Sequence, residues 1–165
     1  METAELEVQK IWDLLEQVSD PEIPVLSVVD LGVVRNIIPN ESGFEIQITP
    51  TYSGCPAMNT IEADIIKLMK EKNINATVKL ILSPAWTTDW MSEKGKQKLK
   101  SYGIAPPEDE DLNLNTIFGE THKVECPRCQ SKNTELVSQF GSTACKALYK
   151  CKDCLEPFDY FKCHR

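Results

Sequence analysis

The sequence predicts an α/β fold class: a small α+β domain with a three-stranded mixed sheet and packing helices, followed by a C-terminal β zinc ribbon. Apolar residues at helical spacing, segments that alternate apolar and polar residues, and two CxxC pairs near the C-terminus lead to this prediction. The 165 residues are enough for one ordinary domain and a small satellite. We expect the first domain over 1–103, a linker over 104–120 and the ribbon over 121–165.

Three helices are expected in the first domain. Apolar residues recur every three or four positions over 3–18, and this helix should end at Asp20-Pro21 because the residue before a proline disfavours the helical conformation. Further helices are predicted over 57–72 and 92–102. The inward face of the second helix is expected to be formed by Met58, Ile61, Ile65 and Leu68.

Alternation of apolar and polar residues predicts three strands. The first covers 33–38 and the second 44–49, with a hairpin turn over 40–43 between them. The third covers 78–82, where Val, Leu and Leu alternate with Lys and Ile. The order helix, hairpin, helix, strand, helix predicts helices on one face of a mixed sheet.

The predicted linker over 104–120 contains Pro106-Pro107 and the acidic run Glu108–Asp111, a composition typical of an exposed connection.

Charge and composition narrow the classes of partner. The net charge is −7; residues 1–120 carry 10 Lys and Arg against 20 Asp and Glu, and residues 121–165 carry 8 against 5. Because an acidic body repels phosphate backbones, we expect no nucleic acid partner. No apolar run is long enough to span a bilayer and no secretory signal is evident, so we expect a cytoplasmic protein without a membrane partner. Cysteines kept reduced there favour metal binding over disulfides.

The strongest motif is the set Cys126, Cys129, Cys151 and Cys154, written CPRC, 21 residues, CKDC. Two such turns can place four sulfurs at the corners of a tetrahedron, with a β-hairpin in the intervening segment, so we expect one structural zinc ion. Four protein ligands leave no position for a substrate, which argues against catalytic zinc. A rubredoxin-like iron site remains an alternative because four thiolates also bind iron.

Three cysteines lie outside this set. Cys145 and Cys163 are expected as small buried apolar residues. Alternatively, Cys163 and His164 could bind a second metal, as could His122. Cys55 stands in the run SGCP, where Pro56 suits the first position of a helix and makes Cys55 its N-cap. A helix dipole would then lower the pKa of the thiol and make it nucleophilic or able to bind metal. A buried cap without chemistry is the alternative.

Other polar and aromatic groups are weaker candidates. Asp20, Glu22 and Asp30 precede the first strand and would, taken alone, be ordinary turn and capping acids. Trp86 and Trp90 stand four residues apart, and they form either part of the core or an aromatic docking patch.

Several motifs together resemble a known family. DPEIPVLSVVDLGVV (20–34) followed by TYSGCP (51–56) resembles the metal–sulfur cluster biosynthetic domain of iron–sulfur assembly factors. The later runs SPAWTTDWMSEKGKQKLKSYGIAPP, CPRC, FGSTACKALYKC and EPFDYFKCH are similar to those of the PaaD family of phenylacetate-degradation proteins. The resemblance covers nearly the whole chain.

The resemblance implies a role beside the bacterial phenylacetyl-CoA epoxidase, which has a di-iron oxygenase component and a flavin and iron–sulfur reductase component. Family members would act as accessory proteins that mature these metal centres. Carried onto this chain, Cys55 matches the motif cysteine, Asp20, Glu22 and Asp30 match the acidic loop, and the four ribbon cysteines match the metal ligands.

Two functions from different classes follow. The first is a maturation factor, not an enzyme by itself, that delivers iron or an iron–sulfur cluster to the oxygenase or reductase. Since one cysteine cannot hold a cluster, a transient cluster at Cys55 would be shared with a second protomer in a homodimer, with an iron–sulfur carrier protein or with the client. The second is a structural subunit that bridges oxygenase and reductase. A nucleic-acid-binding ribbon is disfavoured by the acidic body.

Overall fold

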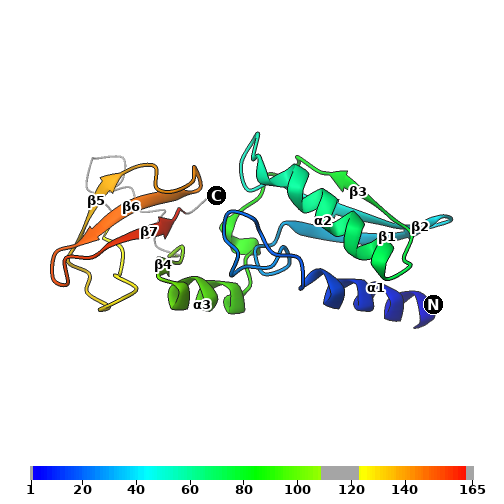
Figure 1. Cartoon of the computed structure of the whole chain (residues 1–165), viewed down its shortest axis with the longest axis horizontal. Coiled ribbons are helices and arrows are strands. Elements are labelled where there is room, and N and C mark those ends of the chain that lie inside the picture. The colour runs from blue at the N-terminus through cyan, green and yellow to red at the C-terminus, as the bar shows by residue number, and fades with distance from the viewer. Residues whose placement is uncertain (1, 109–122, 163–165) are drawn as a thin grey trace. The chain divides into compact units, whose positions relative to one another are not determined.

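The computed structural model describes residues 2–108 and 123–162. The chain divides into two compact units, Met1–Gly95 and Lys96–Arg165, which are coloured from blue to green and from green to red in Figure 1. Within the part of the chain that the structure describes, no helix is both long and apolar enough to cross a membrane.

The N-terminal unit contains a three-stranded mixed sheet, as predicted. Strands β1 and β2 pair antiparallel, β2 and β3 pair parallel, and the order in the sheet is β1-β2-β3. A register shift between Val34 and Asn36 interrupts the first pairing. The elements are α1 (Glu2–Leu15), β1 (Val34–Asn40), β2 (Gly43–Ile48), α2 (Ala57–Glu71), β3 (Ala76–Leu80) and the 3-10 turn η1 (Thr88–Trp90).

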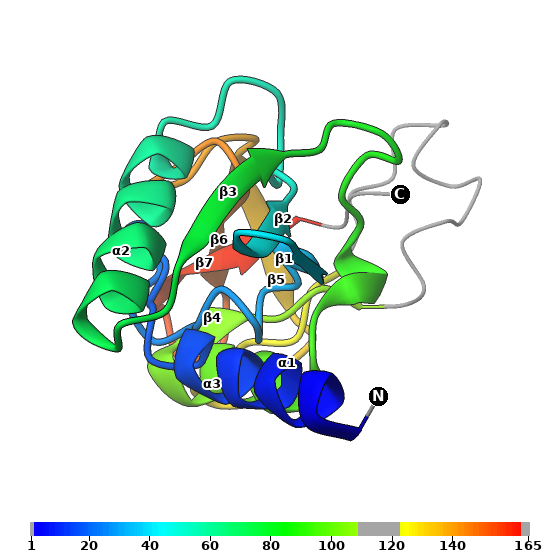
Figure 2. The same cartoon turned by 90° about the vertical axis from the view of Figure 1, so that its right-hand side faces the viewer.

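One face of this sheet forms the core with α1 and α2, which flank it in Figure 2. Alternation in β2 turns Ile46 and Ile48 into this core, where both are almost fully buried. The helices contribute residues at helical spacing: Ile11 and Leu15 from α1, and Met58, Ile61, Ile65 and Met69 from α2. The prediction of Leu68 on the inward face was wrong, because the i+4 step from Ile65 to Met69 keeps the stripe centred on the sheet and leaves Leu68 half-buried.

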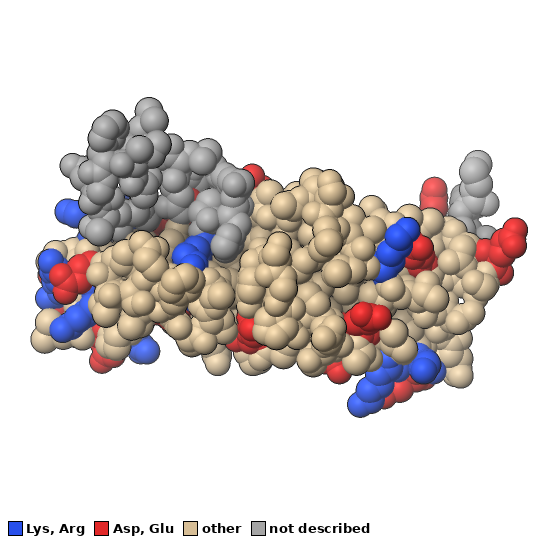
Figure 3. Space-filling view, turned by 90° about the horizontal axis from the view of Figure 1, so that it is seen from above, with Lys and Arg blue, Asp and Glu red and all other residues tan. Residues whose placement is uncertain are grey.

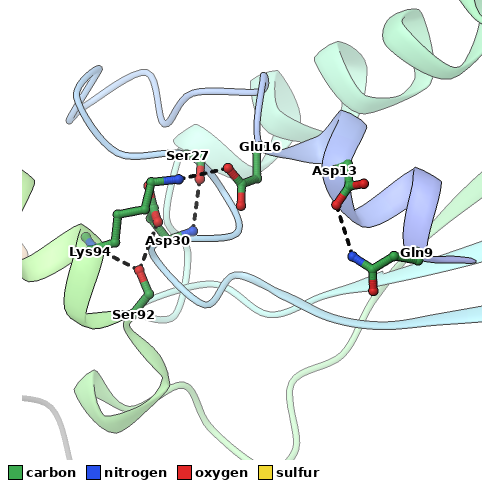
Figure 4. A network of polar contacts seen from close by, with 8 residues as sticks. Gln9, Asp13, Glu16, Ser27, Asp30, Ser92 and Lys94 are labelled. Atoms are coloured by element: carbon green, nitrogen blue, oxygen red, sulfur yellow. Dashed lines mark hydrogen bonds and ion pairs between the residues drawn. The ribbon is translucent and has the colours of Figure 1, made fainter.

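A long loop between α1 and β1 is ordered by its own hydrogen bonds. The Asp20 amide donates to the Leu26 carbonyl, and the Val28 amide donates to the Val18 carbonyl, both at 2.9 Å. Polar contacts also tie this loop and the residue after α1 to the segment where α3 (Glu93–Tyr102) begins (Figure 4). Lys94 Nζ donates to Glu16 Oε2 at 2.9 Å, and Ser92 Oγ donates to Asp30 Oδ1 at 2.8 Å.

The C-terminal unit contains a four-stranded sheet in the order β4-β7-β6-β5. Strands β5 and β6 form an antiparallel hairpin, β6 and β7 pair antiparallel, and β4 adds a short parallel edge to β7. This arrangement confirms the predicted ribbon. The elements are α3 (Glu93–Tyr102), which begins in the N-terminal unit, β4 (Ile104–Ala105), β5 (Thr134–Ser138), β6 (Lys146–Cys151) and β7 (Pro157–Phe161).

The beginning of the predicted linker is part of this sheet. Gly103 ends α3 in a left-handed conformation (φ 95°), and Ile104 and Ala105 then pair with Asp159 and Tyr160. Both apolar residues are buried, which explains why the segment is not an exposed connection at this point. The acidic part of the predicted linker from 109 to 120 lies outside the described residues, and the domain limits remain a prediction.

The ribbon core is small and aromatic. Tyr149 stacks on Phe158 at a centroid distance of 5.9 Å and meets Tyr160 edge-on at 5.6 Å. The buried cluster comprises Ala105, Val124, Cys126, Ala147, Tyr149, Cys151, Phe158 and Tyr160. Two of its eight members are predicted metal ligands, so the metal site is continuous with the core of the ribbon.

Candidate metal centre and the Cys55 loop

Four thiols meet at one end of the ribbon. The sulfurs of Cys126, Cys129, Cys151 and Cys154 all lie within 4.8 Å of one another. The Sγ–Sγ distance is 3.8 Å between Cys126 and Cys154 and 3.5 Å between Cys129 and Cys151. A tetrahedral ion with metal–sulfur bonds of about 2.3 Å needs sulfurs about 3.8 Å apart. The four side chains are therefore arranged to hold a metal ion.

Two similar turns present these sulfurs. After the second cysteine of each pair the chain enters a left-handed conformation, at Gln130 (φ 64°) and at Leu155 (φ 65°). In the first turn the Gln130 amide donates to the Cys126 carbonyl at 2.9 Å, and in the second the Cys151 amide donates to the Glu156 carbonyl at 3.0 Å. Each turn thereby directs two sulfurs to the same point. A bulky residue such as leucine rarely adopts this conformation, so the turn geometry is imposed on the sequence.

Backbone amides also adjust the acidity of the thiols. The amide of Cys154 stabilises the Cys151 thiolate and lowers the pKa of Cys151 to about 7. The Glu156 amide lowers the pKa of Cys154, but burial and the neighbouring thiols raise it more, to about 12. Thus, without a cation, the Cys151 thiolate forms readily, whereas Cys154 is held protonated. A divalent cation at the centre would offset half of the charge of four thiolates and so favour the deprotonated form of all four ligands.

A second set of contacts joins the two turns. Asp153 accepts hydrogen bonds from Ser131 Oγ and from Asn133 Nδ2, the latter at 2.8 Å. These hydrogen bonds lower the pKa of the Asp153 carboxyl. Because Ser131 and Asn133 follow the first cysteine pair and Asp153 lies inside the second, the contacts hold the ligands together from outside the sulfur cluster.

Cys55 lies one residue further from its helix than the sequence predicts. Helix α2 begins at Ala57, and Pro56, already helical at φ −69° and ψ −19°, is the N-cap. Cys55 is half-buried, and its amide donates to the Tyr52 carbonyl at 3.2 Å. Gly54 has φ 75°, a conformation that favours glycine, and a Cβ added there would have no neighbour within 4 Å. The Gly54 side of the loop is therefore open to an approaching molecule.

The predicted fall in the pKa of Cys55 is wrong in direction. Burial raises the pKa of the thiol, and the negative charges of Glu22 and Asp20 raise it further. The Ala57 amide and the Tyr52 hydroxyl favour the thiolate but do not compensate. Tyr52 was not singled out from the sequence, although its position three residues before Cys55 in a turn places the two side chains together. Cys55 is thus a protonated thiol at neutral pH.

The acidic residues of the loop divide into two groups. Asp20 is 6% exposed, and its Oδ1 accepts the amides of Glu22 and Ile23, both at 2.8 Å, so it orders the loop that presents Glu22. Asp30 is 3% exposed and bonds to Ser92. The structure therefore brings Asp20 and Glu22 to Cys55, whereas Asp30 belongs to the network in Figure 4.

The tryptophans pack within the N-terminal unit. Trp86 is 4% exposed, and its Nε1 donates to the Leu31 carbonyl at 3.0 Å, which places it in the core. Trp90 is half-buried, with the Arg35 guanidinium carbon 3.4 Å from its ring centroid. Cys145, in the C-terminal unit, is buried, with its Sγ 3.0 Å from Thr143 Oγ1.

The second metal site considered from the sequence lies outside the described residues, since its candidate ligands are Cys163, His164 and His122.

Charges on the described surface are mixed. On the face drawn in Figure 3, Lys and Arg side chains stand singly or in small groups near Asp and Glu, without a basic stripe. In the C-terminal unit several are paired: Lys100 Nζ lies 2.8 Å from Glu125 Oε1, and Lys152 Nζ lies 3.0 Å from Glu135 Oε2. Such exposed pairs contribute little to stability, about 0–1 kcal/mol each.

Known proteins resemble both units. The family model of an iron-sulfur cluster assembly protein matches residues 8–80, and the model of the PaaD zinc beta ribbon domain matches residues 111–162. A solved structure described as a domain of unknown function, DUF59, from Bacillus anthracis is 30% identical with a TM-score of 0.54, over 58% of this chain and 92% of that one. A conserved hypothetical protein from Thermotoga maritima is 29% identical with a TM-score of 0.47, over 55% of this chain and 91% of that one.

Fold and site together define a class of protein: an iron–sulfur cluster assembly domain joined to a four-cysteine zinc ribbon. A curated relative from Escherichia coli (strain K12) is 49% identical over 158 residues, which are 95% of this chain and 93% of that protein. That relative is named as one subunit of a "Putative 1,2-phenylacetyl-CoA epoxidase". The chain belongs to the PaaD family.

Proposed function

We propose that this chain is an accessory protein that matures the iron or iron–sulfur centres of a phenylacetyl-CoA epoxidase, the activity named for its Escherichia coli relative. The observation that carries the proposal is the match of residues 8–80 to an iron–sulfur cluster assembly protein, with Cys55 half-buried beside an open glycine inside that range. Its partners would be the oxygenase and reductase components and iron–sulfur carrier proteins.

Cys55 would contact the iron that is being transferred. The neutral thiol must lose its proton when iron binds, and the nearby carboxylates of Glu22 and Asp20 attract the incoming cation. A raised pKa suits a transient contact, because the proton competes with the metal and favours release. One thiol cannot complete the ligand set of a cluster, so the remaining ligands would come from the carrier or the client.

We further propose that the ribbon holds one structural zinc ion. Four thiolates complete a tetrahedral set, and two of the ligands belong to the buried core of the ribbon. The ion would fold the ribbon, which would then serve in docking. Iron is the competing occupant of four thiolates, and elemental analysis of protein purified from cells distinguishes the two metals.

The test is to express the oxygenase and the reductase with the full chain, with its Cys55→Ser variant, with its Ser53→Ala variant, and without it. Iron is then measured in each purified component. Ser53 is an exposed residue of the same loop and serves as the matched control. We expect iron-poor components with Cys55→Ser and without the chain, and normal iron with Ser53→Ala.

A structural subunit is the second candidate, and the word "subunit" in the name of the relative favours it. In that case the chain would co-purify with the epoxidase in a fixed ratio and would bridge its oxygenase and reductase components. Loss of the chain would then dissociate the complex without changing the iron content of either component, and Cys55→Ser would have no effect on either property.

A further inference from the structure

Strand β3 is an edge strand of the described sheet in the N-terminal unit. The backbone amides and carbonyls on its outer side are therefore not hydrogen-bonded to another strand of this sheet. Two hydrogen bonds fix which groups face β2: the Phe44 amide donates to the Asn75 carbonyl at 3.0 Å, and the Ile81 amide donates to the Ile48 carbonyl at 2.8 Å. In a parallel ladder every second residue of a strand forms its backbone hydrogen bonds with the same neighbouring strand, and the residues between point their backbone groups to the other side. The amides and carbonyls of Ala76, Val78 and Leu80 therefore face away from β2.

The two edges of this sheet are protected to different degrees. The outer strand β1 contains Pro39 and a register shift between Val34 and Asn36, and both features hinder the addition of another strand. Strand β3 and the two residues after it read ATVKLIL, without a proline or a bulge in the described pairing. Lys79 is the single charged residue of the run. Leu80, the last residue of β3, and Leu82, two residues after it, are 50% and 65% exposed.

We propose that two copies of this chain associate through β3, antiparallel, with the two-fold axis at Val78. The strand is self-complementary in this register, because each outward-facing residue meets an outward-facing residue: Val78 meets Val78 of the second copy, and Ala76 meets Leu80. Each such pair exchanges two backbone hydrogen bonds. The exposed Leu80 side chains would be covered by the strand of the second copy.

The charge of Lys79 and the missing amide hydrogen of Pro84 favour this register over registers with the axis one or two residues away. An axis at Lys79 would set two lysines directly opposite each other, which is destabilising. An axis at Leu80 would bring Pro84, which has no N–H, into the ladder. The axis at Val78 sets Lys79 opposite Thr77 and gives a longer ladder than an axis at Thr77.

The proposed contact has a consequence for the loop that carries Cys55. This loop follows β2, whose C-terminal end lies beside that of β3 because the two strands are parallel. An antiparallel pairing of two β3 strands places the two Cys55 loops at opposite ends of the joined sheet. A cluster bridging the two Cys55 thiols of one dimer is then excluded, and each loop is left to meet a carrier or client separately.

Charge substitutions at Thr77 test the proposal. Thr77 and Lys79 are both exposed, and Thr77 lies opposite Glu45 within the sheet. Thr77→Lys should weaken dimerisation about 2- to 30-fold, since the new lysine of each copy would face Lys79 of the other, while its attraction to Glu45 supports the fold. Thr77→Glu should strengthen dimerisation by a similar factor and slightly weaken the fold. Asn36→Lys on β1 is the matched control and should change neither the dimerisation nor the stability of the fold.

The measurement is sedimentation equilibrium of the purified full chain into the millimolar range, because a contact made by one strand pair is small and weak. Hydrogen exchange should show the amides of Ala76, Val78 and Leu80 protected only at high concentration, whereas those of Thr77 and Lys79 are protected throughout. A chain that stays monomeric, or a dimer unaffected by both Thr77 variants, would overturn the proposal. Neither outcome would affect the proposed role of Cys55 in iron transfer.

Discussion

Replacing Cys151 by serine should unfold the ribbon while the N-terminal unit stays folded. Cys151 is fully buried, its sulfur lies 3.5 Å from that of Cys129, and the Cys154 amide stabilises its thiolate. A serine hydroxyl is a poor ligand in place of a thiolate and leaves a three-sulfur site. The N-terminal unit has its own core, built from α1, α2 and β2, and contributes no ligand to the four-cysteine cluster.

The magnitude follows from the size of the ribbon core. Its buried cluster has eight members, two of them ligands, and a core of this size supplies at most about 3–5 kcal/mol of folding free energy. Binding of zinc to a structural site contributes an apparent folding free energy of roughly 10–16 kcal/mol at neutral pH. The metal term is therefore larger than the core term, so losing a strong ligand should remove most of the stability of the ribbon.

The assay combines metal content with local hydrogen exchange. For Cys151→Ser we expect less than one zinc per chain and a loss of protection in the amides of β6 and β7 of roughly 100-fold or more. The control is Cys145→Ser, which replaces a buried cysteine just before β6 that is outside the four-sulfur cluster. It should keep one zinc. A Cys151→Ser variant with full zinc and wild-type exchange would refute the reasoning, and so would a zinc-free ribbon with unchanged protection.

Three further predictions concern the N-terminal unit. Asp20→Ala should cost about 1–2 kcal/mol of unfolding free energy, because two loop amides lose their acceptor; chemical denaturation measures it, and an unchanged midpoint would contradict it. Gly32→Ala should lower the free energy of unfolding by on the order of 1–3 kcal/mol, since φ of Gly32 is +73° and the new Cβ would meet the Trp90 carbonyl. An unchanged midpoint of thermal unfolding would contradict this prediction. The rate of Cys55 alkylation should continue to rise above pH 9.0, the ordinary pKa of a thiol, because the raised pKa of Cys55 keeps most of the thiol protonated at pH 9.0. Glu22→Gln should lower the pKa of Cys55 and speed its alkylation at pH 8. A rate that levels off below pH 9.0 would be inconsistent with this view.

The sequence predicted the elements well where periodicity and spacing decide them. The helix with Ile61 and Ile65 and the alternating strand with Ile46 and Ile48 are present as expected, because each buries one regular face. The two CxxC pairs lie together, as their spacing predicted, since such spacing is typical of a ribbon that is stabilised by a metal ion. Local signals of this kind are independent of the rest of the chain.

Tertiary context decided what the sequence could not. The pairing of Ile104 with β7 is a long-range contact that no local pattern announces. The pKa of Cys55 was predicted from the helix terminus alone, whereas burial and the charge of Glu22, 33 positions away in the sequence, decide its direction. Asp30 looked equivalent to Asp20, and only the fold separates the two.

Transfer of iron to a defined client tests the central claim most directly. Metal-free reductase would be incubated with iron, sulfide and a reductant, in the presence of the purified full chain or its Cys55→Ser variant, and the iron bound to the reductase would be followed with time. We predict that the wild-type chain accelerates iron incorporation, that Ser53→Ala does so equally, and that Cys55→Ser does not. Equal rates with the wild-type chain and with Cys55→Ser would contradict a transfer role for this thiol and would favour the structural subunit.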